Sequence, residues 1–497
     1  MILRGKEAKE KLLKGINQTA DVIKSTLGAK GKNVLLVDNL RTGFNVTKDG
    51  VSVANKIFLE DTIENCGAIF IQNAARKTVE EAGDATTTTT ILTQSMCNKL
   101  NTEIDLGKSA NELCKDLKAD LKKVKDFIKN TANKVENTNH IKQIAKVSAN
   151  NDEEIGSIIK DIYDKIGFNG TIDVRESDSL ETSFEIVKGF NLPNTGFASQ
   201  HFINNHEKGR VELLNPRVLV FNSKIKDLNE TMYDLLNSNA IEIVDAAPLV
   251  ILVDDIEEIA LRRVIEALSR GIIHNVVVVQ SSLIFETRKN RFKDTAVFLG
   301  AEYCEDKIGE LGSCERIIIE KDSTTFINGV GDTLKYVKKL KSIKDRTFEL
   351  EKRIFDLELN AAIINVGGKL QSEISEKKDR IEDAVCAVKS AIEEGYCAGG
   401  STTFLFAKED LELQTEVMKT ALLSCYEQLL INAEIEPYYI LRDILDKGYG
   451  YGYNVEKEEV QDLLSNGIID SAKALRVSLE NAVSTSCNFC MIESIVG

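Results

Sequence analysis

The chain has 497 residues, of which 43% are hydrophobic and 28% are charged, and its formal net charge is −15. This length exceeds what one ordinary hydrophobic core supports and predicts roughly three domains. The acidic charge argues against a nucleic-acid partner, because binding to phosphates requires basic patches. No apolar stretch reaches the roughly 18 residues of a membrane span, and the charged N-terminal segment is unlike a secretory signal.

The ten cysteines are scattered along the chain, which predicts reduced thiols rather than a disulfide framework. Cys487 and Cys490 form a CxxC pattern, but no second pair stands at metal-ligand spacing. Two small residues on a C-terminal helix or strand are therefore a better interpretation than a redox or metal site.

The N-terminal part of the chain is predicted to be mainly helical. Apolar residues at a spacing of three to four indicate the first helix, and Gly83 and Asp84 interrupt a later helical region. The expected elements are a helix at 6–27, a strand at 33–38, a turn at 47–50 and a helical region at 63–129.

The middle of the chain alternates β-rich and helical stretches, which predicts an α/β layer domain. The expected strands lie at 218–221, 249–253 and 275–279, and the expected helices at 227–236 and 257–270. After about residue 345 the pattern is helical again, through 382–394, and the chain ends in a strand-like stretch at 489–496.

The segment from Asp84 to Thr90 carries one carboxylate followed, after Ala85, by five threonines. A P-loop of the form GxxxxGK[ST] is absent, so a nucleotide site here needs other N–H groups, hydroxyls and a metal-binding carboxylate. A carboxylate before a helix N-terminus offers these together. Spacing alone leaves open the alternative that Asp84 simply caps the helix.

Seven further segments stand in an order and at separations that resemble the group I (GroEL-type) chaperonins. They are TLGAKG at 26–31, TKDGVSVA at 47–54, SANND at 148–152, RIEDA at 380–384, EEGYCAGG at 393–400, YGYN at 451–454 and GIID at 467–470. The resemblance runs from about Gly5 to about Ser494, which is nearly the whole chain.

This resemblance implies an α-rich discontinuous equatorial domain, a small α/β intermediate domain and an α/β apical domain. The expected boundaries are 1–132 and 395–497 for the equatorial domain, 133–188 and 360–394 for the intermediate domain, and 189–359 for the apical domain. The implied function is an ATPase subunit of a ring that binds and encloses non-native proteins and assists their folding.

The resemblance also assigns a nucleotide site for ATP, Mg²⁺ and K⁺. Asp49 and Asp383 match the carboxylates that position the attacking water, and Asp383 is expected to reach the site only when the intermediate domain swings toward it. Asp84 is the expected Mg²⁺ ligand. The residues expected near K⁺ are Thr26, Lys48 and Thr87. The residues expected to contact the nucleotide are Thr26, Leu27, Gly28, Lys48, Asp84, Ala85, Thr86, Thr87, Thr88, Ser148, Gly399, Gly400, Asn454, Ile468 and Asp470.

A client-binding groove is implied in the apical domain. An exposed apolar groove binds unfolded chains with little sequence preference, and several grooves in one ring strengthen weak contacts. The alternative is that the same residues are ordinary amphipathic core positions. The implied groove residues are Phe197, Phe202, Met232, Leu235, Leu236, Leu261 and Ile265.

Several positions depart from the family pattern. Ala85 replaces a glycine beside the metal carboxylate, which costs roughly 1 kcal/mol if the position has a positive φ. Leu359 and Asn360 replace a paired-glycine hinge. Glu427 replaces an arginine that pairs between rings with the acid at Glu436, so we expect weaker ring stacking, with a single ring as the extreme case.

The expected partners are further copies of the chain in a seven-membered ring, single or double, non-native client proteins and a co-chaperonin lid, with no nucleic acid and no membrane. The expected location is the cytoplasm of a bacterial or virus-infected cell, or an organelle matrix if a presequence is absent from the sequence. A second hypothesis is a chaperonin-derived scaffold ring with little or no folding activity. The hinge change favours it, as do Glu266 and His201, which replace an apolar and an aromatic residue in the implied groove. The retained Asp49, Asp84 and Asp383 argue against it.

Overall fold

A computed structural model of the chain describes residues 2–39, 43–149, 151–168, 170–177, 179–206, 208–226, 247–305, 308–343, 347–358 and 360–496. Leu359 and the helix expected at 227–236 lie outside these residues. Among the described residues we find no helix with the length and apolar character that crossing a bilayer requires.

The chain folds into two compact units. The terminal unit comprises residues 1–164, 174–182 and 365–497, and the central unit comprises 165–173 and 183–364. Both chain ends therefore build one unit, with the centre of the chain inserted between them. The boundaries of three domains drawn from the sequence stay a prediction.

Helices make up most of the terminal unit. They are α1 (Gly5–Ile23), α2 (Gly50–Lys56), α3 (Thr62–Ala82), α4 (Thr86–Asp105), α5 (Ala110–Thr131), α6 (Thr138–Ser148), α7 (Glu153–Ile166), α13 (Gln371–Glu394), α14 (Thr402–Asp410), α15 (Glu416–Asn432), α16 (Pro437–Lys447) and α17 (Ala472–Met491), with the 3-10 turn η1 (Lys24–Thr26). The helical region expected at 63–129 is broken a second time, where Gly107 adopts a φ of +90° after α4. The strand-like end expected at 489–496 is partly wrong, because α17 continues to Met491.

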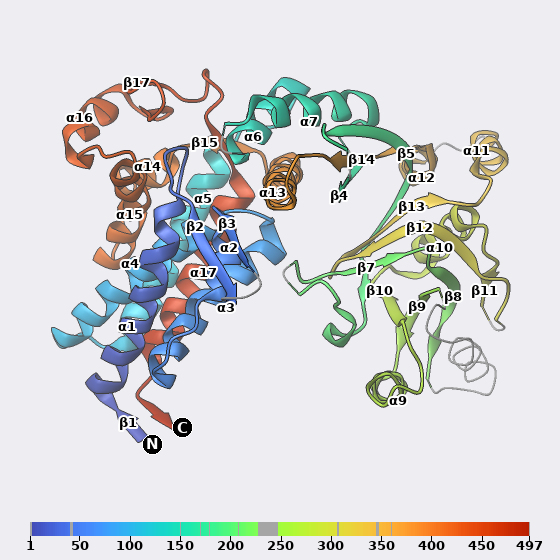
Figure 1. The fold of residues 1–497 in the computed structure, drawn as a ribbon, viewed down its shortest axis with the longest axis horizontal. Helices are drawn as coiled ribbons and strands as arrows, with labels where there is room; N and C mark the ends of the chain where they lie inside the picture. Colours follow the sequence, from blue (N-terminus) through green and yellow to red (C-terminus); the bar gives the residue numbers. More distant parts are fainter. Residues whose placement is uncertain are drawn as a thin grey trace. The chain divides into compact units, whose positions relative to one another are not determined.

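The strands of the terminal unit pair two by two among the described residues. The pairs are β1 (Ile2–Arg4) with β19 (Ser494–Val496), β2 (Val34–Asn39) with β3 (Gly43–Thr47), β15 (Tyr396–Ala398) with β18 (Ile469–Ser471), and β16 (Tyr451–Asn454) with β17 (Glu459–Asp462). Leu3 stands opposite Ile495 in the first pair, so the two chain ends lie together (Figure 1).

The core of the terminal unit is built around α4, which packs against α3, α15 and α17 (Figure 1). Leu92, Met96 and Leu100 stand four residues apart on α4 and are fully buried. This spacing places them on one face of a helix, where they meet apolar residues of α5, α15 and α17.

The central unit is an α/β structure. Its strands are β5 (Ser183–Pro193), β6 (Thr195–Phe197), β7 (Val211–Leu214), β8 (Arg217–Ile225), β9 (Leu249–Ile256), β10 (Val276–Ser281), β11 (Tyr303–Cys304), β12 (Gly312–Ile319), β13 (Ser323–Gly329) and β14 (Asn360–Val366). Its helices are α9 (Glu258–Ser269), α10 (Phe285–Leu299), α11 (Thr333–Lys341) and α12 (Phe348–Glu358), with the 3-10 turn η2 (Gln200–Phe202). The chain also passes through β4 (Thr171–Glu176).

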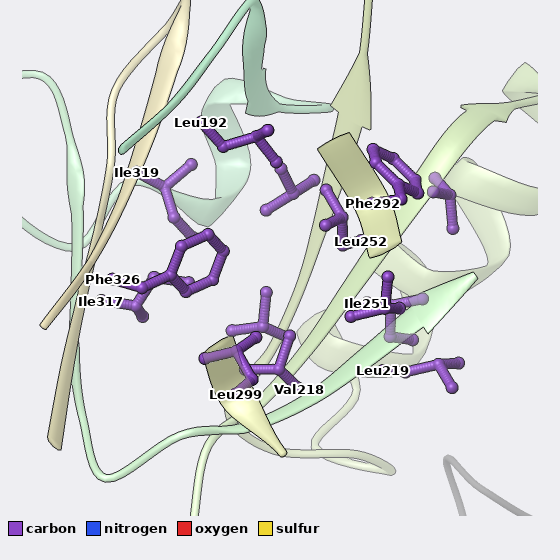
Figure 2. Close-up of a cluster of buried hydrophobic side chains, with 14 of the residues drawn as sticks. Leu192, Val218, Leu219, Ile251, Leu252, Phe292, Leu299, Ile317, Ile319 and Phe326 are labelled. Carbon is purple, nitrogen blue, oxygen red and sulfur yellow. The ribbon is translucent and has the colours of Figure 1, made fainter. Parts of the chain in front are cut away.

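The sheet of the central unit follows the order β14-β5-β13-β12-β8-β9-β10-β6. Its neighbours β8, β9 and β10 are parallel and nearly continuously apolar, because strands of this kind are buried on both faces. They coincide with the three strands predicted from the sequence. Figure 2 shows the core that they form with α10 and the antiparallel strands. The residues labelled there are Leu192, Val218, Leu219, Ile251, Leu252, Phe292, Leu299, Ile317, Ile319 and Phe326.

Candidate functional site

A cavity of about 270 Å³ in the terminal unit brings together segments that are far apart in the sequence. Its walls come from the turn after η1, the turn before α2, the first turn of α4, the end of α6, the middle of α13, and β16 and β18. The predicted catalytic and nucleotide-contacting residues that line it are Thr26, Leu27, Gly28, Lys48, Asp49, Asp84, Ala85, Thr86, Thr87, Thr88, Ser148, Asp383, Gly400, Asn454, Ile468 and Asp470.

The turn after η1 requires a glycine. Gly28 has a φ of +79°, in the left-handed region, and a Cβ at this position would lie 2.3 Å from Cδ1 of Leu429. The turn therefore packs tightly against α15 and exposes its backbone at the cavity wall, which is an arrangement that suits a phosphate.

Asp49 is the N-cap residue of α2. Its Oδ1 accepts a hydrogen bond from the N–H of Val51 at 3.1 Å, and its Oδ2 accepts one from the N–H of Ser52 at 2.8 Å. These bonds fix the orientation of the carboxylate at the cavity wall and satisfy two N–H groups of the first helical turn.

Asp84, in contrast, does not cap α4. The alternative that Asp84 is simply the capping residue of this helix is therefore wrong. The N-cap residue is Ala85, whose side chain has no hydrogen-bond acceptor. Asp84 accepts the N–H of Ala85 at 2.5 Å and the hydroxyl of Ser148 at 2.9 Å. The helix α4 thus begins at the cavity, and its N-cap residue offers no side-chain acceptor to the N–H groups of the first turn. These N–H groups and the helix dipole favour an anion there.

The five consecutive threonines that begin α4, Thr86 to Thr90, divide into two groups. Thr89 and Thr90 donate to carbonyl oxygens one turn earlier, each at 3.0 Å, and are buried in the helix bundle. The other three line the cavity, and Oγ1 of Thr87 lies 3.2 Å from Oγ1 of Thr26. The family resemblance places three residues near K⁺, and all of them line this cavity: Thr26, Thr87 and Lys48.

Asp383 reaches the cavity because α13 docks onto the junction of α3 and α4. Gly83 has a φ of +72°, and a Cβ there would lie 2.3 Å from Cβ of Cys386, so glycine allows this close approach. Ser390 Oγ also donates to the carbonyl oxygen of Ala82 at 2.8 Å. Asp383 lies one turn before Cys386 and is thereby held at the cavity wall.

An ion pair supports the same docking. Arg380 Nη1 lies 2.9 Å from Oδ2 of Asp152, whose other oxygen caps the first turn of α7. Asp152 follows Ser148 by one turn, and Ser148 contacts Asp84. The helix that carries Asp383 is therefore tied to the segment that contacts the predicted metal ligand.

The far wall of the cavity is formed by two small sheets. Asp470 stands on β18 opposite Cys397 of β15. Gly399 does not line the cavity but donates its N–H to the carbonyl oxygen of Ile468 at 2.9 Å, so it supports the wall. Asn454 Oδ1 accepts two backbone N–H groups of the β16–β17 turn, at 2.9 and 3.2 Å.

The carboxylates around the cavity repel one another. Burial and the charges of Asp49 and Asp84 raise the pKa of Asp383 well above its usual range. Burial also raises the pKa of Asp84, with a contribution from Asp49, and it raises the pKa of Asp470 to about 7, with a contribution from Asp84. Burial lowers the pKa of Lys48. Such a concentration of negative charge favours a bound cation and is typical of functional sites.

The donor set fits Mg²⁺. This ion prefers oxygen ligands, keeps several waters and usually binds through one or two carboxylates together with substrate phosphates. Asp84 at the N-terminus of α4 offers such a ligand beside a place for phosphate. Within the described ranges, no group of three or more His, Cys, Asp or Glu side chains is arranged to hold a metal ion.

Sequence reasoning missed some lining residues. Arg380 lines the cavity and stands in a segment that resembles the family, but it was not among the predicted site residues. Glu376 and Asp379 precede it on α13 and also line the cavity. Leu429 and Val455 are apolar residues on a helix and after a hairpin strand, and nothing local in the sequence marks them.

The predicted client residues lie in different surroundings. Phe202 is 6% exposed and belongs to the core of the central unit, which favours the core interpretation for this residue. Phe197, Leu261 and Ile265 are partly buried against the same core. On α9, Ile259 is 62% exposed, and ion pairs of charged residues accompany it on the outer face. Three predicted client residues lie outside the part of the chain that the structure describes: Met232, Leu235 and Leu236.

Comparison with known proteins gives a family and a fold. The family model described as the TCP-1/cpn60 chaperonin family matches residues 19–497. The chain is also similar to crystal structures of the chaperonin gp146 from the bacteriophage EL 2 (Pseudomonas aeruginosa), determined in the presence of ATP-BeFx. For crystal form II the TM-score is 0.68 and for crystal form I it is 0.62; each match has 20% identity and covers 100% of this chain and 99% of the other. The predicted multidomain chaperonin fold is thereby confirmed.

The left-handed conformation of Ala85 predicts a stability effect. Its φ is +70°, so Ala85→Gly is expected to raise the free energy of unfolding by about 0.5–1 kcal/mol. The matched control is Ala119→Gly, at an exposed position within α5, which is expected to lower it by about 1 kcal/mol. Denaturant unfolding without nucleotide measures both, and a loss of stability in both variants would contradict strain at Ala85.

The raised pKa of Asp470 predicts a pH-dependent effect. Because the pKa in the folded protein is about 7 and the usual value lies near 3.8, ionisation of this carboxyl costs the folded state little at pH 4 and the full amount at pH 8. Asp470→Asn is therefore expected to stabilise the nucleotide-free protein at pH 8, by roughly 1–3 kcal/mol, and to change little at pH 4.

Asp462→Asn is the control of opposite sign. Hydrogen bonds from Ser465 lower the pKa of Asp462, so its loss should destabilise the protein at pH 8 and have less effect at pH 4. Thermal unfolding at both pH values measures these changes. An equal shift for Asp470→Asn at both pH values would show that its charge is not the cause.

Proposed function

The chain belongs to the TCP-1/cpn60 chaperonin family, and from this premise we propose that it is an ATP-driven subunit of a ring that binds non-native proteins and assists their folding. The observation that carries the proposal is the convergence of Asp49, Asp84 and Asp383 on one cavity, beside the N-terminus of α4 and the glycine turn after η1. The similar phage chaperonin was crystallised in the presence of ATP-BeFx, which supports ATP as the nucleotide.

In the proposed mechanism, the nucleotide phosphates lie between the turn at Gly28 and the first turn of α4. Mg²⁺ held by Asp84 would neutralise phosphate charge during transfer. The Asp49 carboxylate is held by two backbone N–H groups and orients the attacking water through its remaining lone pairs. A carboxylate oxygen of Asp383 accepts a proton from this water as the water oxygen bonds to the γ-phosphorus and the bond between that phosphorus and the leaving oxygen of ADP breaks.

Docking of α13 gates this chemistry in the proposed mechanism. Asp383 is useful only when the contact of Gly83 with Cys386 and the ion pair of Arg380 with Asp152 are formed. Movement of α13 away from the α3–α4 junction would withdraw the proton acceptor. ATP turnover is thereby coupled to a conformational step.

Client binding is proposed for the central unit. Leu261 and Ile265 stand one turn apart on α9 and are partly exposed, so they offer a small apolar surface on one face of this helix. The charged residues on the same helix limit this surface. A scaffold ring with specific partners is therefore the competing proposal, and ATP turnover separates the two.

Ring assembly is supported by the edges of the small sheets in the terminal unit. A two-stranded sheet is marginally stable alone, and its open edges invite pairing with another chain. On β2, Leu35 and Val37 are 57% and 59% exposed while Leu36 between them is buried. Because alternate residues share a face, β2 presents an apolar outer face that suits a neighbouring copy of the chain.

Weaker stacking of two rings also stays part of the proposal. Glu427 accepts a hydrogen bond from the hydroxyl of Tyr438 in the same chain, and Glu436 precedes α16. Two acidic residues at this corner offer no ion pair to an identical corner of a second ring.

Asp383→Asn tests the catalytic proposal. It removes the proton acceptor but keeps the shape, so kcat for ATP is expected to fall by roughly 10²- to 10⁴-fold, while Mg·ADP affinity changes little. Glu373→Gln, at an exposed position in the first turn of the same helix and outside the cavity wall, is the control and should retain turnover within about twofold. Wild-type protein that binds but does not hydrolyse ATP would favour the scaffold, and unchanged turnover in Asp383→Asn would exclude its role.

Val37→Lys tests the assembly surface. The side chain is exposed within the chain, so the fold should tolerate lysine, whereas a charge on the apolar face should shift rings toward monomers. Leu180→Lys, at an exposed apolar residue after β4, is the control and should assemble normally. Analytical ultracentrifugation measures the species and also distinguishes seven from fourteen subunits in the wild type. Intact rings in Val37→Lys would contradict this use of β2.

A further inference from the structure

The last residue of α15, Asn432, holds the glycine turn of the cavity in place. Its Nδ2 donates to the carbonyl oxygen of Lys24 at 2.9 Å and to that of Leu27 at 3.0 Å. The carbonyl of Lys24 also accepts the N–H of Leu27 at 3.2 Å, whereas the carbonyl of Leu27 lies just past η1, where carbonyl groups have no partner within the helix. One side-chain amide thus binds the carbonyls at both ends of the stretch from Lys24 to Leu27, which leads to Gly28.

The orientation of this amide is fixed from within α15. Gln428 Nε2 donates to Oδ1 of Asn432 at 2.7 Å, one helical turn earlier. Because the oxygen of Asn432 is occupied by this donor, its two N–H groups are directed to the carbonyls of Lys24 and Leu27. The pair Gln428–Asn432 is therefore a defined hydrogen-bonded unit that leads from α15 to the cavity.

A third contact comes from the same end of α15. Leu429 fills the space beside Gly28, where a Cβ would lie 2.3 Å from its Cδ1, and it lies 3.8 Å from the corresponding position at Gly400. Leu429 lines the cavity, whereas Asn432 stands behind the turn and does not. Asn432 thus acts on the cavity through the carbonyls of Lys24 and Leu27.

We propose that Asn432 is a positioning residue for nucleotide binding: it fixes the Thr26–Gly28 backbone in the geometry that receives the phosphates. The inference rests on the proposed ATP site and adds a residue outside its walls. Without the amide, the carbonyl of Leu27 loses this partner, the carbonyl of Lys24 keeps only the N–H of Leu27, and the turn samples other conformations. The binding-competent conformation is then less populated, which weakens apparent affinity in proportion.

The test compares Asn432→Leu with a matched variant elsewhere in the same unit. Leucine is close to asparagine in size but has no N–H donor. Mg·ADP affinity, measured by calorimetry on the assembled protein, is expected to fall about tenfold, and KM for ATP to rise similarly with kcat nearly unchanged. KM rises while kcat stays nearly unchanged because the nucleotide, once bound, itself orders the turn.

Asn98→Leu is the matched control. Asn98 and Asn17 exchange hydrogen bonds of 2.8 and 3.0 Å between α4 and α1, half-buried and outside the cavity walls. This variant should lose a comparable amount of stability while its affinity for Mg·ADP remains within about twofold of wild type. A purely structural role for Asn432 would make the two variants behave alike.

Gln428→Leu keeps the proposal testable if Asn432→Leu fails to fold. It leaves Asn432 in place but removes the bond that orients its amide, so a smaller loss of affinity in the same direction, about threefold, is expected. Wild-type affinity in Asn432→Leu, or in Gln428→Leu when that variant alone folds, would overturn the inference. An equal loss in Asn98→Leu would do the same. Failure of wild-type protein to bind Mg·ADP would instead refute the proposed nucleotide site.

Discussion

Like charges held together at one cavity are the constraint on which the terminal unit depends. Asp49, Asp84 and Asp383 come from three segments, and their mutual repulsion and burial raise the pKa values of Asp84 and Asp383. Like charges gathered in one cavity destabilise the folded chain, so the surrounding structure must hold them by other means. Hydrogen bonds from backbone N–H groups to Asp49 and from Ser148 to Asp84, and the docking of α13 behind Asp383, supply this restraint.

The glycines of the site serve close packing rather than flexibility. Gly83 allows α13 to approach the α3–α4 junction, and Gly28 allows the end of α15 to approach the turn after η1. Each of these approaches brings a functional group to the cavity: Asp383 in the first case and the backbone at Thr26–Gly28 in the second. Ala85 shows what happens where a left-handed position keeps a side chain, since its φ remains positive at a cost to the fold.

The two units place different demands on their residues. In the central unit, parallel β8, β9 and β10 are buried on both faces, and apolar residues such as Phe202 that the family resemblance assigned to client binding serve the core here. In the terminal unit, apolar residues remain outside on β2, at Leu35 and Val37, where the edges of small sheets are open. Exposed apolar surface that the fold of a single chain does not use is thus clearer on β2 of the terminal unit than on α9 of the central unit. The outer face of α9 carries ion pairs.

The sequence by itself determined the alternation of elements, because apolar periodicity and glycine breaks are local properties. It also predicted nearly half of the residues around the cavity, through short segments that resemble one family. It did not determine that Asp49 rather than Asp84 caps a helix, that α17 extends to Met491, or that Gly399 stands behind the wall. Nor did it mark Leu429 or Asn432, whose roles depend on contacts with residues about 400 positions away. Only the tertiary structure decided these points, because a hydrogen bond or a close approach between distant segments leaves no pattern in the local order of residues.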